Sequence, residues 1–411
     1  NDIRFRFNDI NFSSKNISAK KKANHYLIKG NFDNDSIGLS DTKLILFKKV
    51  FFPNLNLKQI DFSSNSIFSL DINEKFQIMN YEINSKVKVD KLKIKKKFDL
   101  KEVFPEISDE IILLNNHINF ALKKDFLKFS GEGDVIFQNE IDQLAYSFEK
   151  KNKEILFQNN LRIKKNPFRL SFLNYEKNKK KEATIKISGL IDKNKQTFLD
   201  MVSLDEGDNK IEIEKIYLNK KFRINSLYKA DLNYLDKDNK KNIIKIINED
   251  NIYILKGEYF NAKKLIQTII ENEKSNNYFD KNLEIKLNIK NVLLGDKFEL
   301  FDLIGNLKFK GQELLSGSLS GNFRDEKKMK FTVNSLNNEK ITTFFIAYAE
   351  PIIKNYKFIK GFEEGKLSYG SIEKNNITKS NLKIYNFKVK EVPVLAKLLT
   401  LASLQGIADL L

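Results

Sequence analysis

The chain has 411 residues, of which 41% are hydrophobic, and a net charge of +18 that comes mostly from lysine. This hydrophobic content allows a sizeable core and argues against general disorder. The chain contains no cysteine, which excludes disulfides and thiolate chemistry but fits a reducing compartment as well as an oxidising one.

The basic charge has two interpretations. An excess of lysine can attract nucleic acid or anionic lipid head groups. However, Lys, Asn and Ile are abundant together, as in proteins encoded by AT-rich genomes, and we favour this compositional origin of the charge. No helix-turn-helix, RNA-recognition signature or zinc module accompanies the basic residues. A basic nucleic-acid-binding β-protein therefore stays an alternative that we do not favour, and we expect no nucleic acid as a partner.

Alternation of apolar and polar residues with period two predicts half-buried strands along most of the chain. The clearest run places Leu283, Ile285, Leu287 and Ile289 on one side of a strand, with polar residues between them. Short polar turns between such runs favour hairpins and meanders over parallel units. In chain order the runs are Ile3/Phe5/Phe7, Val87/Val89, Leu92/Ile94, Ala183/Ile185/Ile187, Ile211/Ile213, Leu283 to Ile289 and Met329/Phe331/Val333.

Glycine recurs inside these predicted strands. Because glycine weakens a strand, it usually marks a bulge, a bend or a close approach of two backbones, and its recurrence would let a long sheet curl. We therefore predict a mostly β protein with a long antiparallel, curled sheet, a β-groove or gutter. The strand glycines are Gly30, Gly131, Gly133, Gly189, Gly257 and Gly305.

A few short helices are predicted beside the strands. Residues Leu100 to Leu114 are expected to form a short helix of only a few turns, because the segment carries Pro105. Asn261 to Asn272 has helical apolar spacing, and Thr342 to Ile359 adds a helix interrupted at Pro351. Pro393 to Leu411 begins with a proline at a plausible first helical position and continues as an apolar run. We expect two regions, 1–180 and 181–411. Both ends of the chain look truncated, and no stretch reaches the length of a membrane span.

Motifs for catalysis are missing from the sequence. Neither His25 nor His117 has a metal-ligand partner at a standard spacing. The Gly317–Gly321 stretch has leucine where a nucleophile elbow needs serine, and the Gly361–Lys366 stretch is one residue short of a phosphate-binding loop. We therefore predict a protein that binds rather than catalyses, with no cofactor and no metal.

The most specific motif lies at the C-terminal end, where a strand over Leu382–Val389 precedes the run from Pro393 to Leu411. This arrangement is similar to the signature of the AsmA-like C-terminal region family of bacterial intermembrane lipid-transfer proteins. The similarity covers residues 183–411 and is strongest over 361–411. The signature residues are Pro393, Leu395, Ala396, Leu398, Leu399, Leu401, Ala402, Ser403, Leu404, Gly406, Asp409, Leu410 and Leu411.

The resemblance implies a function in lipid transport. Members of the family form a β-gutter with an apolar lining in the periplasm, and they are associated with moving phospholipid from the inner to the outer membrane. The implied partners are phospholipid, the inner membrane through an anchor that is missing from this chain, and outer-membrane components. The full-length protein is thus expected in the periplasm, anchored to the inner membrane. The residues expected to line the groove are Leu283, Ile285, Leu287, Ile289, Phe331 and Val333.

Two alternatives stay open at this point. The same alternation builds a closed β-sandwich, in which the apolar face is a dry core rather than a groove. The protein could also be a structural scaffold of outer-membrane biogenesis that carries no lipid. The C-terminal helix could be a lid, a cap on a sheet edge or a membrane-surface element, and we favour the cap because an open edge invites aggregation.

Overall fold

The computed structural model describes residues 3–7, 10–40, 56–96, 99–219, 224–264, 282–295, 298–311, 313–355, 361–375 and 377–390. The chain divides into two compact units. Unit 1 comprises Asn1–Ser171 and Glu176–Gly207, and unit 2 comprises Phe172–Tyr175 and Asp208–Leu411. The fold is mostly β in both units.

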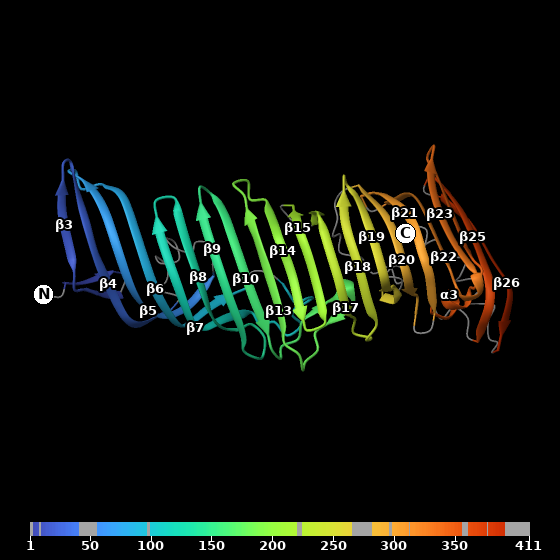
Figure 1. Cartoon of the computed structure of the whole chain (residues 1–411), viewed down its shortest axis with the longest axis horizontal. Coiled ribbons are helices and arrows are strands. Elements are labelled where there is room, and N and C mark those ends of the chain that lie inside the picture. The colour runs from blue at the N-terminus through green and yellow to red at the C-terminus, as the bar shows by residue number, and fades with distance from the viewer. Residues whose placement is uncertain are drawn as a thin grey trace. The chain divides into compact units, whose positions relative to one another are not determined.

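Unit 1 is built from long strands that pair antiparallel with their neighbours in the chain, and these strands lie side by side in Figure 1. At the N-terminus, β2 pairs with β1 and meets β4, which also pairs with β3 and β5. The strands are β1 (Ile3–Phe7), β2 (Ile10–Ser14), β3 (Ile17–Lys22), β4 (His25–Ser40), β5 (Leu57–Asn73), β6 (Ile78–Lys95), β7 (Glu110–Lys123), β8 (Phe126–Ile136), β9 (Asp142–Lys151), β10 (Glu154–Ile163), β11 (Arg169–Leu170), β13 (Ala183–Ile191) and β14 (Thr197–Glu206).

Unit 2 is also built from antiparallel strands, with one parallel pair. Its strands pair antiparallel in chain order, except that β19 and β20 are parallel. Two short elements, η1 (Ser171–Leu173) and β12 (Tyr175–Glu176), lie in the segment where the chain passes from one unit to the other and back. The remaining elements are β15 (Asn209–Leu218), β16 (Ile224–Ser226), β17 (Lys229–Leu235), β18 (Lys241–Glu249), β19 (Ile252–Asn261), β20 (Leu283–Leu293), β21 (Glu299–Lys310), β22 (Glu313–Asn322), η2 (Arg324–Glu326), β23 (Lys328–Leu336), β24 (Glu339–Ile346), α3 (Glu350–Asn355), β25 (Phe362–Lys374) and β26 (Ile377–Val389).

The predicted strands are confirmed, whereas one predicted helix is wrong. Every alternating run named above lies in a strand. The helix expected over Leu100–Leu114 is instead a set of turns followed by the start of β7. Pro105 has no backbone N–H to donate, and Ile107 packs into a core cluster with Leu113. Of Thr342–Ile359, the first part is the end of β24, and α3 starts at Glu350, so Pro351 lies in its first turn. The run Pro393–Leu411 and most of Asn261–Asn272 lie outside the described residues.

Two strand glycines of unit 1 lie close to an aromatic side chain of a neighbouring strand. A Cβ atom at Gly131 would come within 2.8 Å of the Tyr146 hydroxyl, and one at Gly189 within 3.0 Å of the Phe157 ring. The register also shifts at Gly189, which is the bulge expected of a strand glycine. Glycine thus makes room for aromatic side chains on one face of the sheet.

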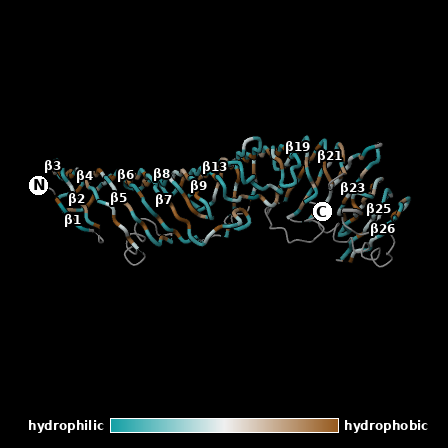
Figure 2. Tube along the Cα trace, turned by 90° about the horizontal axis from the view of Figure 1, so that it is seen from below, coloured by the Kyte–Doolittle hydropathy of each residue, from teal (hydrophilic) through white to brown (hydrophobic). Residues whose placement is uncertain are grey.

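The buried core of unit 1 lies toward one end of its long strands. Leu39, Leu57 and Phe62 are buried together near the C-terminal end of β4, and Leu113, Val135 and Phe137 form a second cluster with Ile107. Residues nearer the opposite ends of the same strands, such as Ile28 and Leu70, are only half-buried. The alternation along these strands is visible in Figure 2.

A buried ionic cluster joins the ends of β9, β10 and β14 in unit 1. Asp142 is completely buried, Lys177 is 3% exposed and Glu206 is 1% exposed. The Asn166 amide donates to Asp142 at 2.7 Å, and the Lys177 ammonium donates to the Lys164 carbonyl at 2.8 Å. Desolvation by burial lowers the pKa of Lys177, although the negative charges of Glu206 and Asp142 act in the opposite direction. Desolvation by burial also raises the pKa of Asp142.

Unit 2 has a core of its own. Ile346, Ile353 and Phe362 are fully buried, and the short α3 contributes Ile353 to this cluster beside β25. A second cluster of Leu314, Phe331 and Val333 lies among β22 and β23. In the part of the chain that the structure describes, no helix is long and apolar enough to cross a membrane.

Candidate functional site

An unbroken row of phenylalanines crosses four neighbouring strands of unit 1. Phe120 on β7 is the register partner of Phe129 on β8, which is the partner of Phe148 on β9, which is the partner of Phe157 on β10. The Phe129 and Phe148 rings are stacked, with centroids 4.9 Å apart. Because register partners point to the same side of a sheet, these four side chains, the aromatic row, lie on one face.

On β7 and β8 the neighbouring positions on this face are also apolar, whereas the same rows include the exposed Lys150 on β9 and Asn159 on β10. Leu122 pairs with Leu127 on one side of the aromatic row, and Ile118 pairs with Gly131 on the other. Further along the strands of unit 1, Phe32 contacts Phe12 and Phe68 through ring centroids 5.4 and 5.8 Å apart. We call this side of the unit 1 strands the apolar face.

The aromatic row is half-buried rather than closed off. All four phenylalanines, together with Ile118, Leu122 and Leu127, keep partial exposure to solvent. This contrasts with Leu39 and Leu57, which are each 1% exposed in the core of the same unit. An apolar surface of this kind can contact a further apolar group without rearrangement of the strands.

Tyr146 brings a hydroxyl group to the apolar face but no charge at neutral pH. Its ring lies 6.2 Å from that of Phe129, and desolvation by burial raises its pKa to about 12. The phenol therefore stays protonated.

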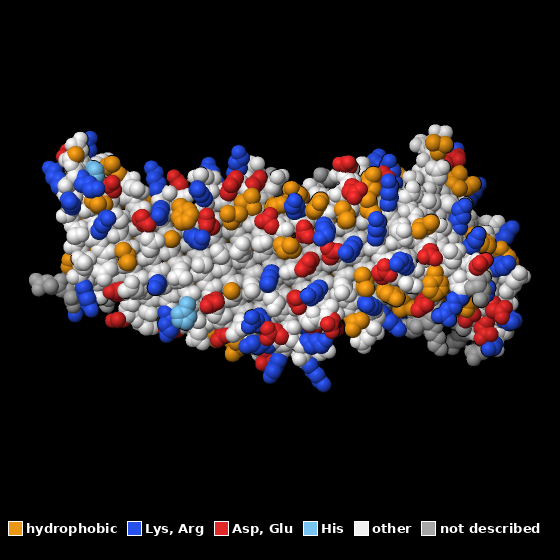
Figure 3. Space-filling view, in the orientation of Figure 1, with side chains coloured by type: hydrophobic (Ala, Val, Ile, Leu, Met, Phe, Trp, Pro, Cys, Tyr) orange, Lys and Arg blue, Asp and Glu red, His pale blue; other side chains and the backbone are white. Residues whose placement is uncertain are grey.

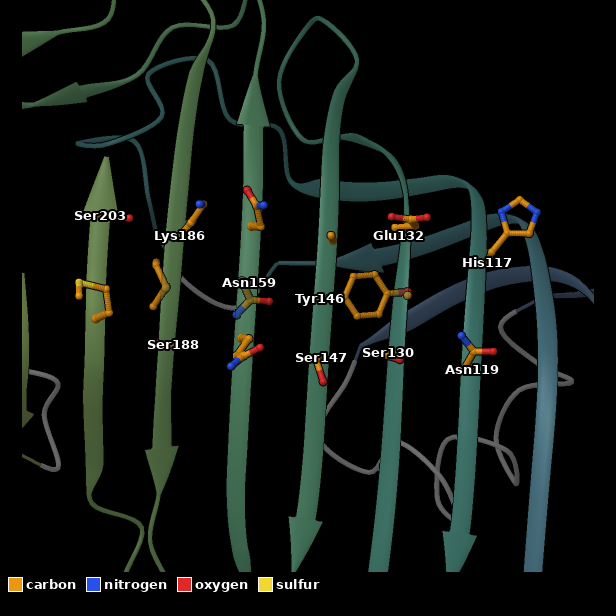
Figure 4. Close-up of a pocket in the computed structure, with 16 residues that line it drawn as sticks. His117, Asn119, Ser130, Glu132, Tyr146, Ser147, Asn159, Lys186, Ser188 and Ser203 are labelled. Carbon is orange, nitrogen blue, oxygen red and sulfur yellow. The ribbon is translucent and has the colours of Figure 1, made fainter. Parts of the chain in front are cut away.

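The opposite face of the same strands is polar. Figure 4 shows Asn119 on β7, Ser130 on β8 and Ser147 on β9 in a shallow depression of about 670 Å³. Much of this face is white in Figure 3, the colour of uncharged polar side chains and backbone. The charged groups that line the depression are Glu132 and Lys186, with His117 beside them. The depression is wide open, and hydroxyl and amide groups make up most of its lining.

The six residues predicted to line a groove fall in unit 2, and the register places them on one face. Leu287 connects through Gly305 and Leu319 to Phe331 by successive register pairs. Ile285 connects in the same way through Leu307 and Gly317 to Val333.

Burial separates these six residues into two groups. Leu283, Ile285 and Leu287 are half-buried, as the aromatic row is. Ile289, Phe331 and Val333 are only 3 to 4% exposed, and they belong to the two core clusters of unit 2. The first group can meet a ligand directly, whereas the second supports the sheet from within a closed core. The signature residues Pro393 to Leu411 lie outside the described residues.

Comparison with known proteins adds no relative. No family model, no curated protein and no solved structure matches the chain. A function for the chain is therefore inferred from the geometry of the two faces and from the C-terminal sequence motif. Among the described residues, no group of three or more His, Asp or Glu side chains is arranged to hold a metal ion.

The aromatic row was not predicted, because alternation shows which side of a strand is apolar but not which residues of neighbouring strands become partners. A signal was nevertheless present in the spacing about the turns. Phe120 and Phe129 are equally distant from the turn at Lys124–Asp125, and Phe148 and Phe157 are equally distant from the turn at Asn152–Lys153. In a tight two-residue hairpin, positions equally distant from the turn become register partners.

Proposed function

We propose that this chain binds the acyl chains of phospholipid along the apolar face of its strands. In this proposal it is a periplasmic segment of an AsmA-like protein, its sheet curls into a groove, and it supports phospholipid transport between the inner and outer membranes. The observation that carries the proposal is the half-buried aromatic row, which is backed on the other side of the same strands by hydroxyl and amide groups.

The physical basis is the hydrophobic effect alone. Each methylene that leaves water contributes about 0.8 kcal/mol, so a segment of eight methylenes on the apolar face gains roughly 6 kcal/mol before the cost of ordering the chain. Stacked phenylalanines give such a chain a smooth surface without directional partners, which suits movement along the sheet. The proposed role is passive conduction, with no catalytic group.

The cellular setting comes from the C-terminal motif. The similarity of Pro393–Leu411 to the AsmA-like signature supports a place in the periplasm and attachment to the inner membrane. The partners in this proposal are phospholipid and outer-membrane components.

A scaffold that carries no lipid is the second candidate, and one observation favours it. Ile289, Phe331 and Val333 are closed within core clusters, so part of the apolar side of unit 2 is already filled by protein. In that case the alternation of the strands serves only to hold a long sheet together.

Photo-crosslinking separates the two candidates in unit 2. A photoreactive residue at Ile285 or Leu287 is expected to form phospholipid adducts, because both side chains are half-buried on the apolar side of β20. The same residue at the exposed Lys286, which points to the other side, is expected to form none. Adducts are detected by mass spectrometry of the purified chain. An absence of adducts at all three positions would favour the scaffold.

A further inference from the structure

An exposed aromatic turn stands beside a run of lysines at one end of unit 1. Phe76 is 81% exposed and Ile78 is 61% exposed at the turn between β5 and β6. Strand β3, which pairs with β4 on the other side from β5, ends in Lys20, Lys21 and Lys22, which are all exposed. We call these residues, with Tyr26 and Lys75, the lysine–aromatic tip.

The turn holds Phe76 outward by its own hydrogen bonds. The Asn73 side-chain oxygen accepts from the backbone N–H groups of Lys75 at 3.0 Å and Gln77 at 2.9 Å, and the Phe76 N–H donates to the Asn73 carbonyl at 2.9 Å. This is the self-bonded turn that asparagine favours. An ordered turn thus presents a large apolar ring to solvent, with the exposed Ile78 two residues away.

Aromatic and cationic groups of the tip are in contact. The Tyr26 and Phe76 rings are parallel, with centroids 6.5 Å apart. The Lys21 ammonium lies 5.8 Å from the centre of the Tyr26 ring. The nearby acidic side chains are Glu74, in the turn, and Asp71, whose carboxylate lies 3.5 Å from His25. The tip and its neighbours thus contain four lysines, Lys20, Lys21, Lys22 and Lys75, but only two carboxylates, so the tip has a net positive charge.

We propose that the lysine–aromatic tip docks on the surface of a bilayer that contains anionic phospholipid. Aromatic rings favour the boundary between head groups and acyl chains, and lysines next to them are attracted to anionic head groups. A nucleic acid would match the lysines but would leave the aliphatic Ile78 without a partner.

The tip is continuous with the apolar face of unit 1. Tyr26 pairs with Ile72, Ile28 with Leu70, and Gly30 with Phe68, which leads to the ring cluster around Phe32. A tip that sits in the head-group layer would therefore place the end of the apolar face at the membrane, where an acyl chain could pass between the two. This last step rests on the proposed function, whereas the docking does not.

Sedimentation with lipid vesicles tests the docking. The full chain is mixed with vesicles of phosphatidylcholine alone or with added phosphatidylglycerol. We expect binding only to the second, and an approximately hundredfold weaker partition for K20Q/K21Q/K22Q, since each lysine at an anionic surface contributes about fivefold. F76S/I78S is also expected to weaken binding, because it removes the apolar part of the tip.

The control removes the same charge elsewhere. K179Q/K180Q/K181Q neutralises three exposed lysines of another unit 1 turn and is expected to bind as the unmodified chain does. Equal loss in both lysine variants would show attraction by diffuse charge and would overturn the proposal, as would full binding by F76S/I78S. Circular dichroism confirms that each variant is folded. If photo-crosslinking gave lipid adducts at Leu287 but the chain did not bind vesicles, the docking proposal would be wrong while the proposed lipid binding would stand.

Discussion

We expect the double substitution F129D/F148D to reduce the phospholipid that co-purifies with the chain by at least roughly tenfold. Phe129 and Phe148 stack at the centre of the aromatic row, so two carboxylates there would have to lose water whenever an acyl chain lay across the strands. Lipid extracted from equal amounts of purified protein and counted by mass spectrometry gives the ratio.

Two further variants separate loss of the site from loss of the fold. F129L/F148L keeps the face apolar and is expected to retain lipid. S130D/S147D places the same charges on the polar face, one residue away on the same strands, and is expected to retain lipid as well. Equal lipid loss in S130D/S147D would show that the effect comes from charge or from unfolding and not from the apolar face.

The second large effect is on stability. We expect K177M to lower the free energy of unfolding of unit 1 by about 3 to 5 kcal/mol, because it removes a buried positive charge that interacts with the charges of Asp142 and Glu206. It also removes the donor to the Lys164 carbonyl. The methionine side chain fills a similar volume, so the loss reports on charge more than on packing. Urea denaturation followed by circular dichroism measures the change.

An exposed lysine in the same segment provides the control. K179M alters a side chain in solvent two residues away and is expected to change stability by less than about 0.5 kcal/mol. If K177M lowered the free energy of unfolding no more than K179M does, the buried cluster would not stabilise the ends of β9, β10 and β14.

The strands could be predicted from the sequence because alternation is a local property. The run from Leu283 to Ile289 shows it without reference to any partner strand, and β20 follows the run closely. The segment 100–114 misled the prediction for a physical reason: apolar residues three or four apart, such as Val103 and Ile107, resemble a helix. They lie in the turns and loop before β7 instead, and Ile107 packs into a core cluster with Leu113 and Val135 of neighbouring strands.

Burial could not be predicted in the same way. Ile285 and Phe331 have similar patterns in the sequence, but Ile285 is half-buried whereas Phe331 is enclosed by Leu314, Leu319 and Phe344. The difference arises from which residues the register brings beside them, and that information lies in the strand pairing. The lysine–aromatic tip was missed for the same reason, since Tyr26 and Phe76 are fifty residues apart and meet only when β4 pairs with β5.

The chain contains no tryptophan, which allows the most direct test of lipid binding on the apolar face. A single tryptophan replaces either Phe148 or its neighbour Ser147, and phospholipid brominated on its acyl chains is added as a short-range quencher. The proposal predicts strong quenching in F148W and little in S147W, because the two side chains point to opposite faces of β9. Equal quenching in both variants, or none in F148W, would contradict it.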